Sequence, residues 1–559
     1  MALLAIAVVA LLIVGYVVYG RFIARTYALD DARVTPAVRL DDGVDFVPTP
    51  RFYLLGQHFS AIAAAGPIAG PILACQLFGW LPCVLWIVVG VVFIGAVHDF
   101  SALIASVRHG ASSVAEVVRE HVGRRAWLAM MLFIWLALVY VLVAFADITA
   151  TTFVGKTEEL AGLGGRFNKG GAVAAASALY LLLALTMGLV QKRFAPPLWL
   201  LTLIFVPATL GAVWAGTHLS TWLVWGARTW GLVILAYCFV AAMLPMWLLL
   251  QPRGYLGGFV LYLALAVGVG GIFFSGLEIQ QPAFKTWEAP SAMGMGTLFP
   301  FLFVTIACGA CSGFHGLVCS GTTSKQIRRE SDCRPVGYGG MLLEGFVALI
   351  ALATIMFVAD SDVAGRGPGR IYGDGIGRFV AAIVGEEHLL FASTFGAMAF
   401  STFVFDTIDV GTRLGRYIVQ ELLAWKGRAA MVLATALTVL PPAIVLGTTQ
   451  AVPGQPPSYM RFWALFGTAN QLLAALTLMG VAVWLRREGR RTWFVVAPMI
   501  FVLSMTVWSL LRQIALSTDA LIRGTAIALL ALAALLAAES LGAVLRGRAA
   551  MPAAEGEAR

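Results

Sequence analysis

Hydrophobic residues in this 559-residue chain gather in long runs that short polar segments separate. Runs of roughly 18 to 25 apolar residues are long enough to cross the ~30 Å hydrocarbon core of a bilayer as helices, and the chain holds about fifteen of them. We expect them near 2–20, 54–78, 81–106, 127–152, 172–190, 197–216, 229–250, 255–276, 297–319, 338–359, 389–412, 430–448, 462–485, 493–512 and 522–545. The pattern predicts an all-α polytopic membrane protein.

Two of these apolar segments contain residues that break helices. The stretch Gly66 to Pro71 reads Gly-Pro-Ile-Ala-Gly-Pro, and segment 229–250 contains Pro245. Such interruptions free backbone groups that lipid cannot satisfy, so they are tolerated only where they line protein or a wet cavity. Paired interrupted segments in the two halves of a chain are typical of the substrate site of a secondary transporter.

The spacing of the two breaks predicts an inverted repeat. The Pro245 segment is the fifth span after the Gly66 segment, and an odd offset reverses the orientation of a helix in the membrane. We therefore expect a five-plus-five inverted-repeat core with broken helices, made of spans two to eleven. A helical bundle with incidental kinks is the alternative. The resulting division is 1–53 (first helix and cytoplasmic loop), 54–415 (core), 416–545 (additional helices) and 546–559 (cytoplasmic tail).

Composition and charge agree with a membrane protein. The chain is 60% hydrophobic and 12% charged, with a mean hydropathy of +0.87. Most of its 38 basic residues fall in the odd-numbered loops and the C-terminal tail, which predicts a periplasmic N-terminus and a cytoplasmic C-terminus. Because the basic residues are spread over short loops, we expect no nucleic-acid partner. The first apolar run lacks a basic start and a cleavage site, so we expect a retained helix.

Five ordered motifs resemble the carbon starvation protein A family, over residues from about 2 to 490. They are Gln57-His58-Phe59 with Gly66 to Pro71, His98-Asp99-Phe100, Ser312 to His315 with Ser320 to Thr323, Thr407 to Tyr417, and Trp463 to Leu473. The resemblance implies a bacterial inner-membrane transporter of the amino acid-polyamine-organocation superfamily, expressed during nutrient limitation. Its implied substrate is a peptide or pyruvate, carried by proton symport. The chain looks shorter than the longer family members, so the substrate stays open.

The first break is the expected binding element for an anionic substrate. A half-helix that starts after Gly66 presents free N–H groups and a positive dipole end, which suit the carboxylate that pyruvate and peptides share. A peptide also needs a partner for its amine, for which Asp99, Glu344 and Tyr237 are candidates. The predicted substrate-binding residues are His58, Gly66, Pro67, Gly70, Tyr237, Ser312 and His315.

Polar residues in segment 297–319 and just beyond it recur at three- and four-residue steps. Cys308, Cys311, Ser312, His315, Cys319 and Thr322 are expected on one helix face. His315 is central to this stripe, and histidine changes charge near neutral pH, which suits proton exchange. The alternative is a neutral histidine bonded to a backbone carbonyl. Since no fourth ligand accompanies the two cysteines and the histidine, we expect no metal and no cofactor.

Other intramembrane polar groups complete the candidate coupling site. Asp99 and Glu344 are candidate proton carriers with His315, although Asp99 can instead pair with a loop arginine. The hydroxyls of Ser320, Thr322 and Thr323 offer hard oxygens for sodium, or simply cap a helix end. Two further groups are expected to be structural. They are an Asp409 to Arg413 ion pair and interhelical hydrogen bonds from Asn470 and Gln471, outside the core.

These features predict a secondary active transporter that imports pyruvate or small peptides. Proton symport is the expected mechanism, with a sodium-coupled peptide or amino acid transporter, or a nutrient sensor without transport, as alternatives. An enzyme is not expected, because the chain contains neither H-E-x-x-H nor G-x-S-x-G. The expected partners are the substrate, H⁺ (or Na⁺) and membrane lipid.

Overall fold

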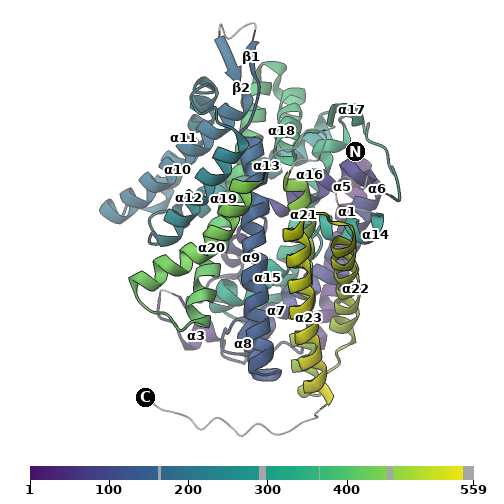
Figure 1. The fold of residues 1–559 in the computed structure, drawn as a ribbon. Coiled ribbons are helices and arrows are strands. Elements are labelled where there is room, and N and C mark those ends of the chain that lie inside the picture. Colours follow the sequence, from purple (N-terminus) through teal and green to yellow (C-terminus); the bar gives the residue numbers. More distant parts are fainter. Residues whose placement is uncertain (44, 161–164, 289–296, 364, 450–457, 546–559) are drawn as a thin grey trace.

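The computed structural model describes residues 1–43, 45–160, 165–288, 297–363, 365–449 and 458–545. The described chain is nearly all helical (Figure 1), and twelve of its helices are long and apolar enough to cross a membrane, or thirteen if one bent pair counts as a span. The all-α polytopic membrane fold is therefore confirmed. The count of fifteen is not. The predicted cytoplasmic tail, 546–559, lies outside the described residues.

The twelve spans follow the apolar runs of the sequence. They are Ala2–Thr26 (containing α1 and α2), Trp80–Arg108 (α6 and α7), α9 (Arg124–Thr152), α10 (Lys169–Phe194), α11 (Leu198–His218), α13 (Leu250–Phe274), Glu330–Met356 (ending in α16, Gly340–Met356), Glu386–Leu422 (mostly α19, Leu389–Leu422), α20 (Arg428–Thr448), α21 (Ser458–Arg487), α22 (Trp493–Leu516) and α23 (Ala520–Leu545). Helix α21 is the most deeply buried of these, and it packs against α9, α15 and α22.

The first predicted break is present. Helices α4 (Arg51–Ile62) and α5 (Gly66–Phe78) meet at an angle of 47°. The backbone leaves the helical region at Ala63, with ψ of 59°, and Pro67 then stands in the first turn of α5. Proline is favoured there because the missing N–H would have no intrahelical acceptor. Sequence therefore sets both the end of α4 and the start of α5.

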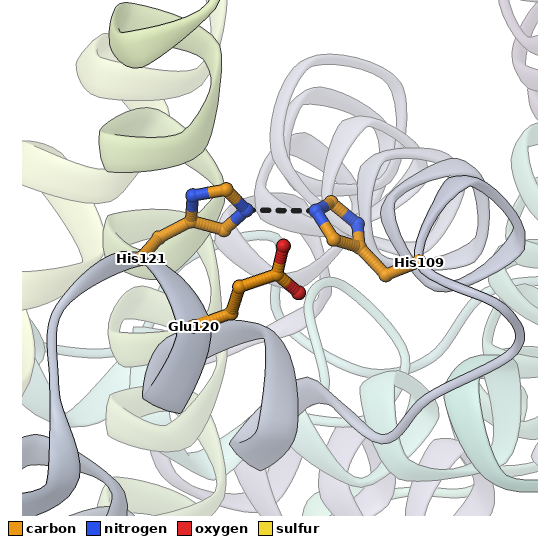
Figure 2. A group of neighbouring side chains, drawn as sticks. All are labelled: His109, Glu120 and His121. Carbon is orange, nitrogen blue, oxygen red and sulfur yellow. Dashed lines mark hydrogen bonds between the residues drawn. The ribbon is translucent and has the colours of Figure 1, made fainter. Parts of the chain in front are cut away.

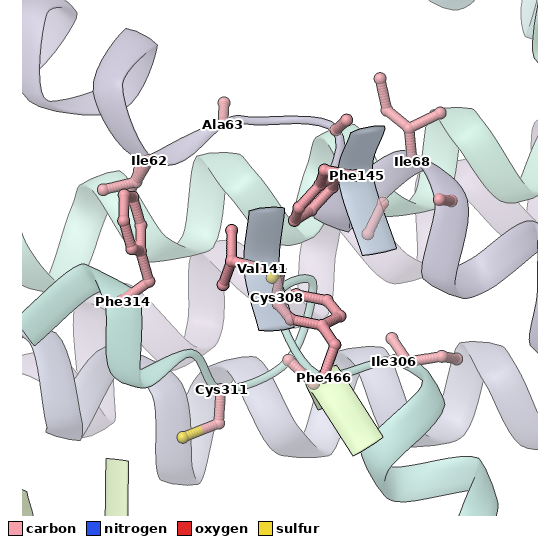
Figure 3. Close-up of a cluster of buried hydrophobic side chains, with 14 of the residues drawn as sticks. Ile62, Ala63, Ile68, Val141, Phe145, Ile306, Cys308, Cys311, Phe314 and Phe466 are labelled. Carbon is pink, nitrogen blue, oxygen red and sulfur yellow. The ribbon is translucent and has the colours of Figure 1, made fainter. Parts of the chain in front are cut away.

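The second break does not lie at Pro245. Helix α12 (Ala227–Met243) ends before that proline, and the chain turns into α13. The second interrupted helix is instead α14 (Leu298–Thr305) followed by α15 (Gly313–Val318), with the non-helical residues 306–312 between them. These two breaks face each other (Figure 3). The α4–α5 and α14–α15 breaks are seven predicted spans apart, whereas the sequence indicates an offset of five. Seven is also an odd number, and the inverted repeat stays a prediction.

Several short elements were not expected from the apolar pattern. An antiparallel hairpin of β1 (Thr157–Leu160) and β2 (Gly165–Asn168) projects at one end of the molecule, near α18 (Pro368–Val384) (Figure 1). Helix α18 packs along α19 and α13. Its charged residues and glycines interrupt the apolar pattern, so the sequence gives no membrane-length apolar run there. The short helices α3 (Pro36–Arg39) and α8 (Val114–His121) lie at the opposite end.

Candidate functional site

Three titratable side chains from three helices meet in the centre of the molecule. Nδ1 of His315 on α15 is hydrogen-bonded to Oδ2 of Asp99 on α7 (Ala96–Arg108) at 2.8 Å. Nε2 of the same ring lies 3.0 Å from Oε2 of Glu344 on α16. All three side chains are buried. The predicted coupling residues Asp99, His315 and Glu344 therefore form one contact chain, in which an imidazole connects two carboxyl groups.

One further histidine extends this cluster, and a second, His58, forms a separate bond beside it. Nδ1 of His98 is hydrogen-bonded to Oδ1 of Asp99 at 2.7 Å, so both oxygens of that carboxyl group are occupied by imidazoles. The alternative that Asp99 pairs with a loop arginine is therefore wrong. Nδ1 of His58, at the last turn of α4, is hydrogen-bonded to the hydroxyl of Thr323 at 2.9 Å. This bond joins the first broken helix to the turn Cys319–Thr323, which follows α15.

Four polar atoms in and beside the cluster have no hydrogen-bond partner among the described residues. They are Nε2 of His58, Nε2 of His98 and both carboxyl oxygens of Glu344, whose ion-pair contact with His315 is not aligned as a hydrogen bond. Buried polar groups are nearly always satisfied, so unpaired ones concentrate where a proton, water or ion is handled. Buried carboxyl groups also require a compensating charge. The arrangement can hold a proton on His315 and pass it between Asp99 and Glu344.

The second break is stabilised by Asn470 of α21. Its Oδ1 accepts from the backbone N–H of Phe314 at 3.0 Å, and its Nδ2 donates to Ser312 Oγ at 3.0 Å and to Cys308 Sγ at 3.3 Å. The interhelical hydrogen bonding expected for Asn470 is therefore present. The sequence places this residue outside the core, but the structure places it against the unwound segment.

The carbonyl groups freed at the end of α14 also receive donors from other helices. The three bonds are Trp463 Nε1 to Thr305 O at 3.0 Å, Trp86 Nε1 to Ile306 O at 3.2 Å and Gln471 Nε2 to Phe303 O at 2.9 Å. An indole N–H can only donate, so it suits an orphan carbonyl. Trp86 carried no signal in the sequence, because a tryptophan in an apolar run is usually read as a packing residue.

The start of α5 has no such side-chain cap. Its N-cap residue, Ala65, has no hydroxyl or carboxyl group to offer to the first-turn N–H groups. The neighbouring backbone comes close to the second break, since a Cβ on Gly66 would lie 2.6 Å from Cys308 Cβ and one on Gly70 would lie 2.6 Å from Thr305 O. In Figure 3, Val141, Phe145 and Phe466 lie between the two breaks. Apolar side chains therefore fill the space where a substrate is expected.

The remaining hydroxyl candidates donate to carbonyl groups of their own helix, and Ser320 Oγ also accepts from the N–H of Val114 at 3.2 Å. Ser320 Oγ donates to Gly316 O at 2.7 Å, and Thr322 Oγ1 donates to Val318 O at 3.1 Å. Thr322 is exposed, whereas Thr323 is buried and reaches His58. Of the three hydroxyls expected to offer a sodium site, only that of Thr323 faces the first broken helix.

The expected stripe on one helix face is wrong. Cys308, Cys311 and Ser312 lie in the non-helical segment before α15, and only His315 of the first four members is on the helix. Cys319 and Thr322 follow in a π-helical turn, Cys319–Thr323. The three- and four-residue steps in the sequence therefore do not correspond to one surface, because hydrogen bonds from α21 replace the helical ones.

Tyr237 belongs to a different polar cluster. Its hydroxyl donates to Asp409 Oδ2 at 2.7 Å and accepts from Arg253 Nη1 at 2.9 Å. Arg253 is fully buried and forms ion pairs with Asp409 and, at 2.8 Å, with Asp406. The structure therefore does not bring Tyr237 to the central cluster.

The expected pair between Asp409 and Arg413 is also wrong. Arg413 Nη2 donates to the carbonyl groups of Ala241 and Leu244 at 2.7 and 2.6 Å, at the end of α12. Arg416 similarly donates to Ala242 O at 2.7 Å. These two arginines satisfy the orphan carbonyls before Pro245, and Asp409 pairs with Arg253 instead.

The family model described as "Carbon starvation protein CstA" matches residues 1–365 and 357–509. The peptide transporter CstA of Escherichia coli (strain K12) is 33% identical, covering 94% of this chain and 82% of that protein. The pyruvate/proton symporter BtsT of the same strain is 30% identical, covering 90% and 80%. A mutant of the Eremococcus coleocola manganese transporter is similar in structure with a TM-score of 0.48 at 14% identity, covering 91% and 99%.

Proposed function

Because the chain belongs to the carbon starvation protein CstA family, we propose that it is a secondary active transporter that imports pyruvate or small peptides by proton symport. The observation that carries the proposal is the contact of one buried imidazole, that of His315, with two carboxyl groups from different helices. His315 itself lies on the interrupted helix α14–α15, which faces the α4–α5 break. A proton change at His315 can therefore act directly on the substrate-facing segments.

The proposed substrate carries a carboxylate. Relatives at similar identity are named as peptide transporters and as a pyruvate/proton symporter, and both kinds of substrate contain this group. The first turn of α5 carries no side-chain cap and offers a positive dipole end to it, whereas Pro67 has no N–H and the N–H groups of Ile68 and Ala69 donate to Ala65 O. His58, Gly66, Pro67, Gly70, Ser312 and His315 are proposed to line the path. Movement of Phe145 would open space between the breaks.

The proposed coupling ion is the proton. A proton site needs groups that exchange protons, and Asp99, His315 and Glu344 supply a connected set. A sodium site needs several hard oxygens around one point. Thr323 shares its hydroxyl with His58 and Thr322 turns away, so the hydroxyl run offers a poorer cation site than the sequence indicates.

We further propose that the protein lies in the bacterial inner membrane and responds to nutrient starvation, with its N-terminus in the periplasm. Helix α1 begins toward the hairpin end, and α23 ends at the end that carries α8 (Figure 1). The loops near α8 are rich in arginine, which favours the cytoplasm. A fluorescent protein fused after the C-terminus should fluoresce, and alkaline phosphatase fused there should be inactive. The opposite pattern would reverse the orientation.

Counterflow in proteoliposomes tests the function directly. Vesicles loaded with unlabelled pyruvate should take up labelled pyruvate transiently, and vesicles loaded with a dipeptide should do so with a labelled dipeptide if peptides are the substrate. The expected result is counterflow with at least one of the two. Binding without any flux of either compound would contradict transport and favour the sensor alternative. Empty vesicles and vesicles with heat-denatured protein are the controls.

A further inference from the structure

A second group of titratable side chains lies at the end of the molecule that carries α8. His109 follows the last residue of α7, and Glu120 and His121 close α8 (Figure 2). The two imidazoles face each other, with their Nε2 atoms 2.7 Å apart. The Glu120 carboxyl group points toward the gap between them, and one ligand atom from each of the three residues lies within 4.8 Å of the others.

Local structure holds these side chains in place. Nδ1 of His109 is hydrogen-bonded to the carbonyl oxygen of Ala105 at 2.6 Å, and its ring packs edge-on against Trp484 of α21 at 5.2 Å between centroids. Helix α8 begins at a Ser113 side-chain cap that accepts from the N–H of Glu116. The cluster is therefore built on two anchored helix ends rather than on a loose loop.

The hydrogen-bonding pattern leaves the Nε2 lone pair of His109 directed at His121, whose Nε2 donates in the bond between the two rings. Because a carbonyl oxygen only accepts, the proton of His109 is on Nδ1 and its Nε2 carries a lone pair. A carbonyl that orients a histidine in this way is the usual support of a metal-binding imidazole. In the described part of the chain no ion pair involves Glu120, whereas Glu116, one turn earlier, pairs with Arg119.

We propose that His109, Glu120 and His121 bind a divalent transition-metal ion of the Zn²⁺ type. Two imidazole nitrogens and one carboxylate oxygen are the ligands such ions prefer, and they discriminate against Mg²⁺ and Ca²⁺. Tetrahedral zinc places two nitrogen ligands about 3.3 Å apart, so the Nε2 atoms separate by about 0.6 Å on binding. Rotation of His121 at the end of α8 supplies this movement, the proton of its Nε2 transfers to Nδ1 through solvent so that Nε2 can bind the metal, and water takes the fourth position.

The charge state of His121 is compatible with binding. Burial, with smaller contributions from His109 and Arg487, lowers the pKa of His121 to about 4. Its imidazole is therefore neutral at pH 7, as a metal ligand must be. The proposal does not depend on which substrate the protein transports.

Titration of the purified full-length protein, without a polyhistidine tag and after treatment with a chelator, tests the site. We expect one Zn²⁺ ion per chain to compete with a chromophoric chelator. Co²⁺ should give the visible bands of a tetrahedral site. His109→Ala and His121→Ala should each abolish this binding, and Glu120→Gln should weaken it by at least about tenfold. Mg²⁺ should not compete.

The control variant is His388→Ala. His388 is exposed and lies 3.8 Å from Glu387, so it represents an ordinary surface His–Glu pair. Its loss should leave binding unchanged. Thermal unfolding of each variant without metal shows whether the fold is kept. The site is refuted if the parent binds no zinc at micromolar concentration, or if His109→Ala and His121→Ala bind as the parent does.

Discussion

At the scale of single residues, the burial of His315 between two carboxyl groups is costly unless a proton is shared. Ionised carboxyl groups removed from water need a paired charge, and Asp99 and Glu344 are both fully buried. His315 is the group that contacts both of them. A change of protonation at any of the three alters the pairing of the others. Removal of one member should therefore uncouple transport from the proton gradient.

We predict that His315→Gln and Asp99→Asn abolish accumulation of substrate against its gradient but retain counterflow. Neither variant can carry the proton in the same way, while both keep a polar group of similar size. Accumulation in proteoliposomes with an imposed inward pH gradient is the measurement. His218→Ala, an exposed histidine bonded to its own helix, is the matched control. Full accumulation by both variants would move the proton site elsewhere.

Asn470 illustrates how one side chain can replace helical hydrogen bonds. It accepts from the first turn of α15 and donates into the unwound segment before it. In a membrane each unsatisfied backbone group costs several kcal/mol, so residues 306–312 depend on donors and acceptors from other helices. This dependence explains why Asn470 lies where two helices meet rather than toward lipid.

At the scale of elements, the two interrupted helices pack through their backbones. Glycine allows this approach, because a Cβ at Gly66 would overlap Cys308 and a Cβ at Gly70 would overlap the carbonyl of Thr305. A larger residue must push α5 away from the second break. Both breaks would then lose the geometry on which substrate access depends.

We predict that Gly66→Leu or Gly70→Leu leaves the protein inserted in the membrane but abolishes uptake. Uptake of labelled substrate by cells, with membrane content measured by immunoblot, checks this. Gly211→Leu is the control, since no atom lies within 4 Å of a Cβ at that position of α11. The pair Gly66→Ala and Cys308→Gly should restore part of the activity that Gly66→Ala loses. Unchanged uptake in both leucine variants would remove the role of the break.

At the scale of the whole molecule, a coupling ion must reach the central cluster from one side of the membrane and leave it on the other side. The cluster connects α7, α15 and α16, and the separate bond between His58 and Thr323 joins α4 to the turn that follows α15. Arg108, at the end of α7, binds Glu330 at 3.0 Å and the carbonyl of Tyr27 at 2.9 Å on the side that carries α8. These contacts hold the end of α7 against Tyr27 and Glu330 on that side.

We predict accumulation when an inward pH gradient is imposed in sodium-free buffer. Transport that requires sodium and ignores the pH gradient would overturn proton coupling. In that case Thr323→Ala should raise the sodium concentration needed for half-maximal uptake, because its hydroxyl faces the first broken helix. Thr322→Ala should have a smaller effect, since Thr322 is exposed and bonded within its own turn.

The sequence by itself determined the membrane-spanning class, the first break and the three coupling candidates. Each rests on local chemistry. Apolar runs of membrane length must be helical because lipid offers no hydrogen bonds, and Gly66 and Pro67 end one helix and start the next without help from distant residues. An ionisable group such as Asp99 in an apolar run is costly enough to indicate function wherever it packs.

Only the tertiary structure decided where the second helix breaks and which groups pair. Residues 306–312 contain one glycine and no proline, so no local signal ends α14. Asn470, Trp463 and Trp86 supply the missing hydrogen bonds from positions far along the chain. Asp409 likewise pairs with Arg253 rather than with a residue one turn away. The stabilisation that such tertiary contacts provide depends on which helices pack together, and this packing cannot be predicted from the residues next to each other in the sequence.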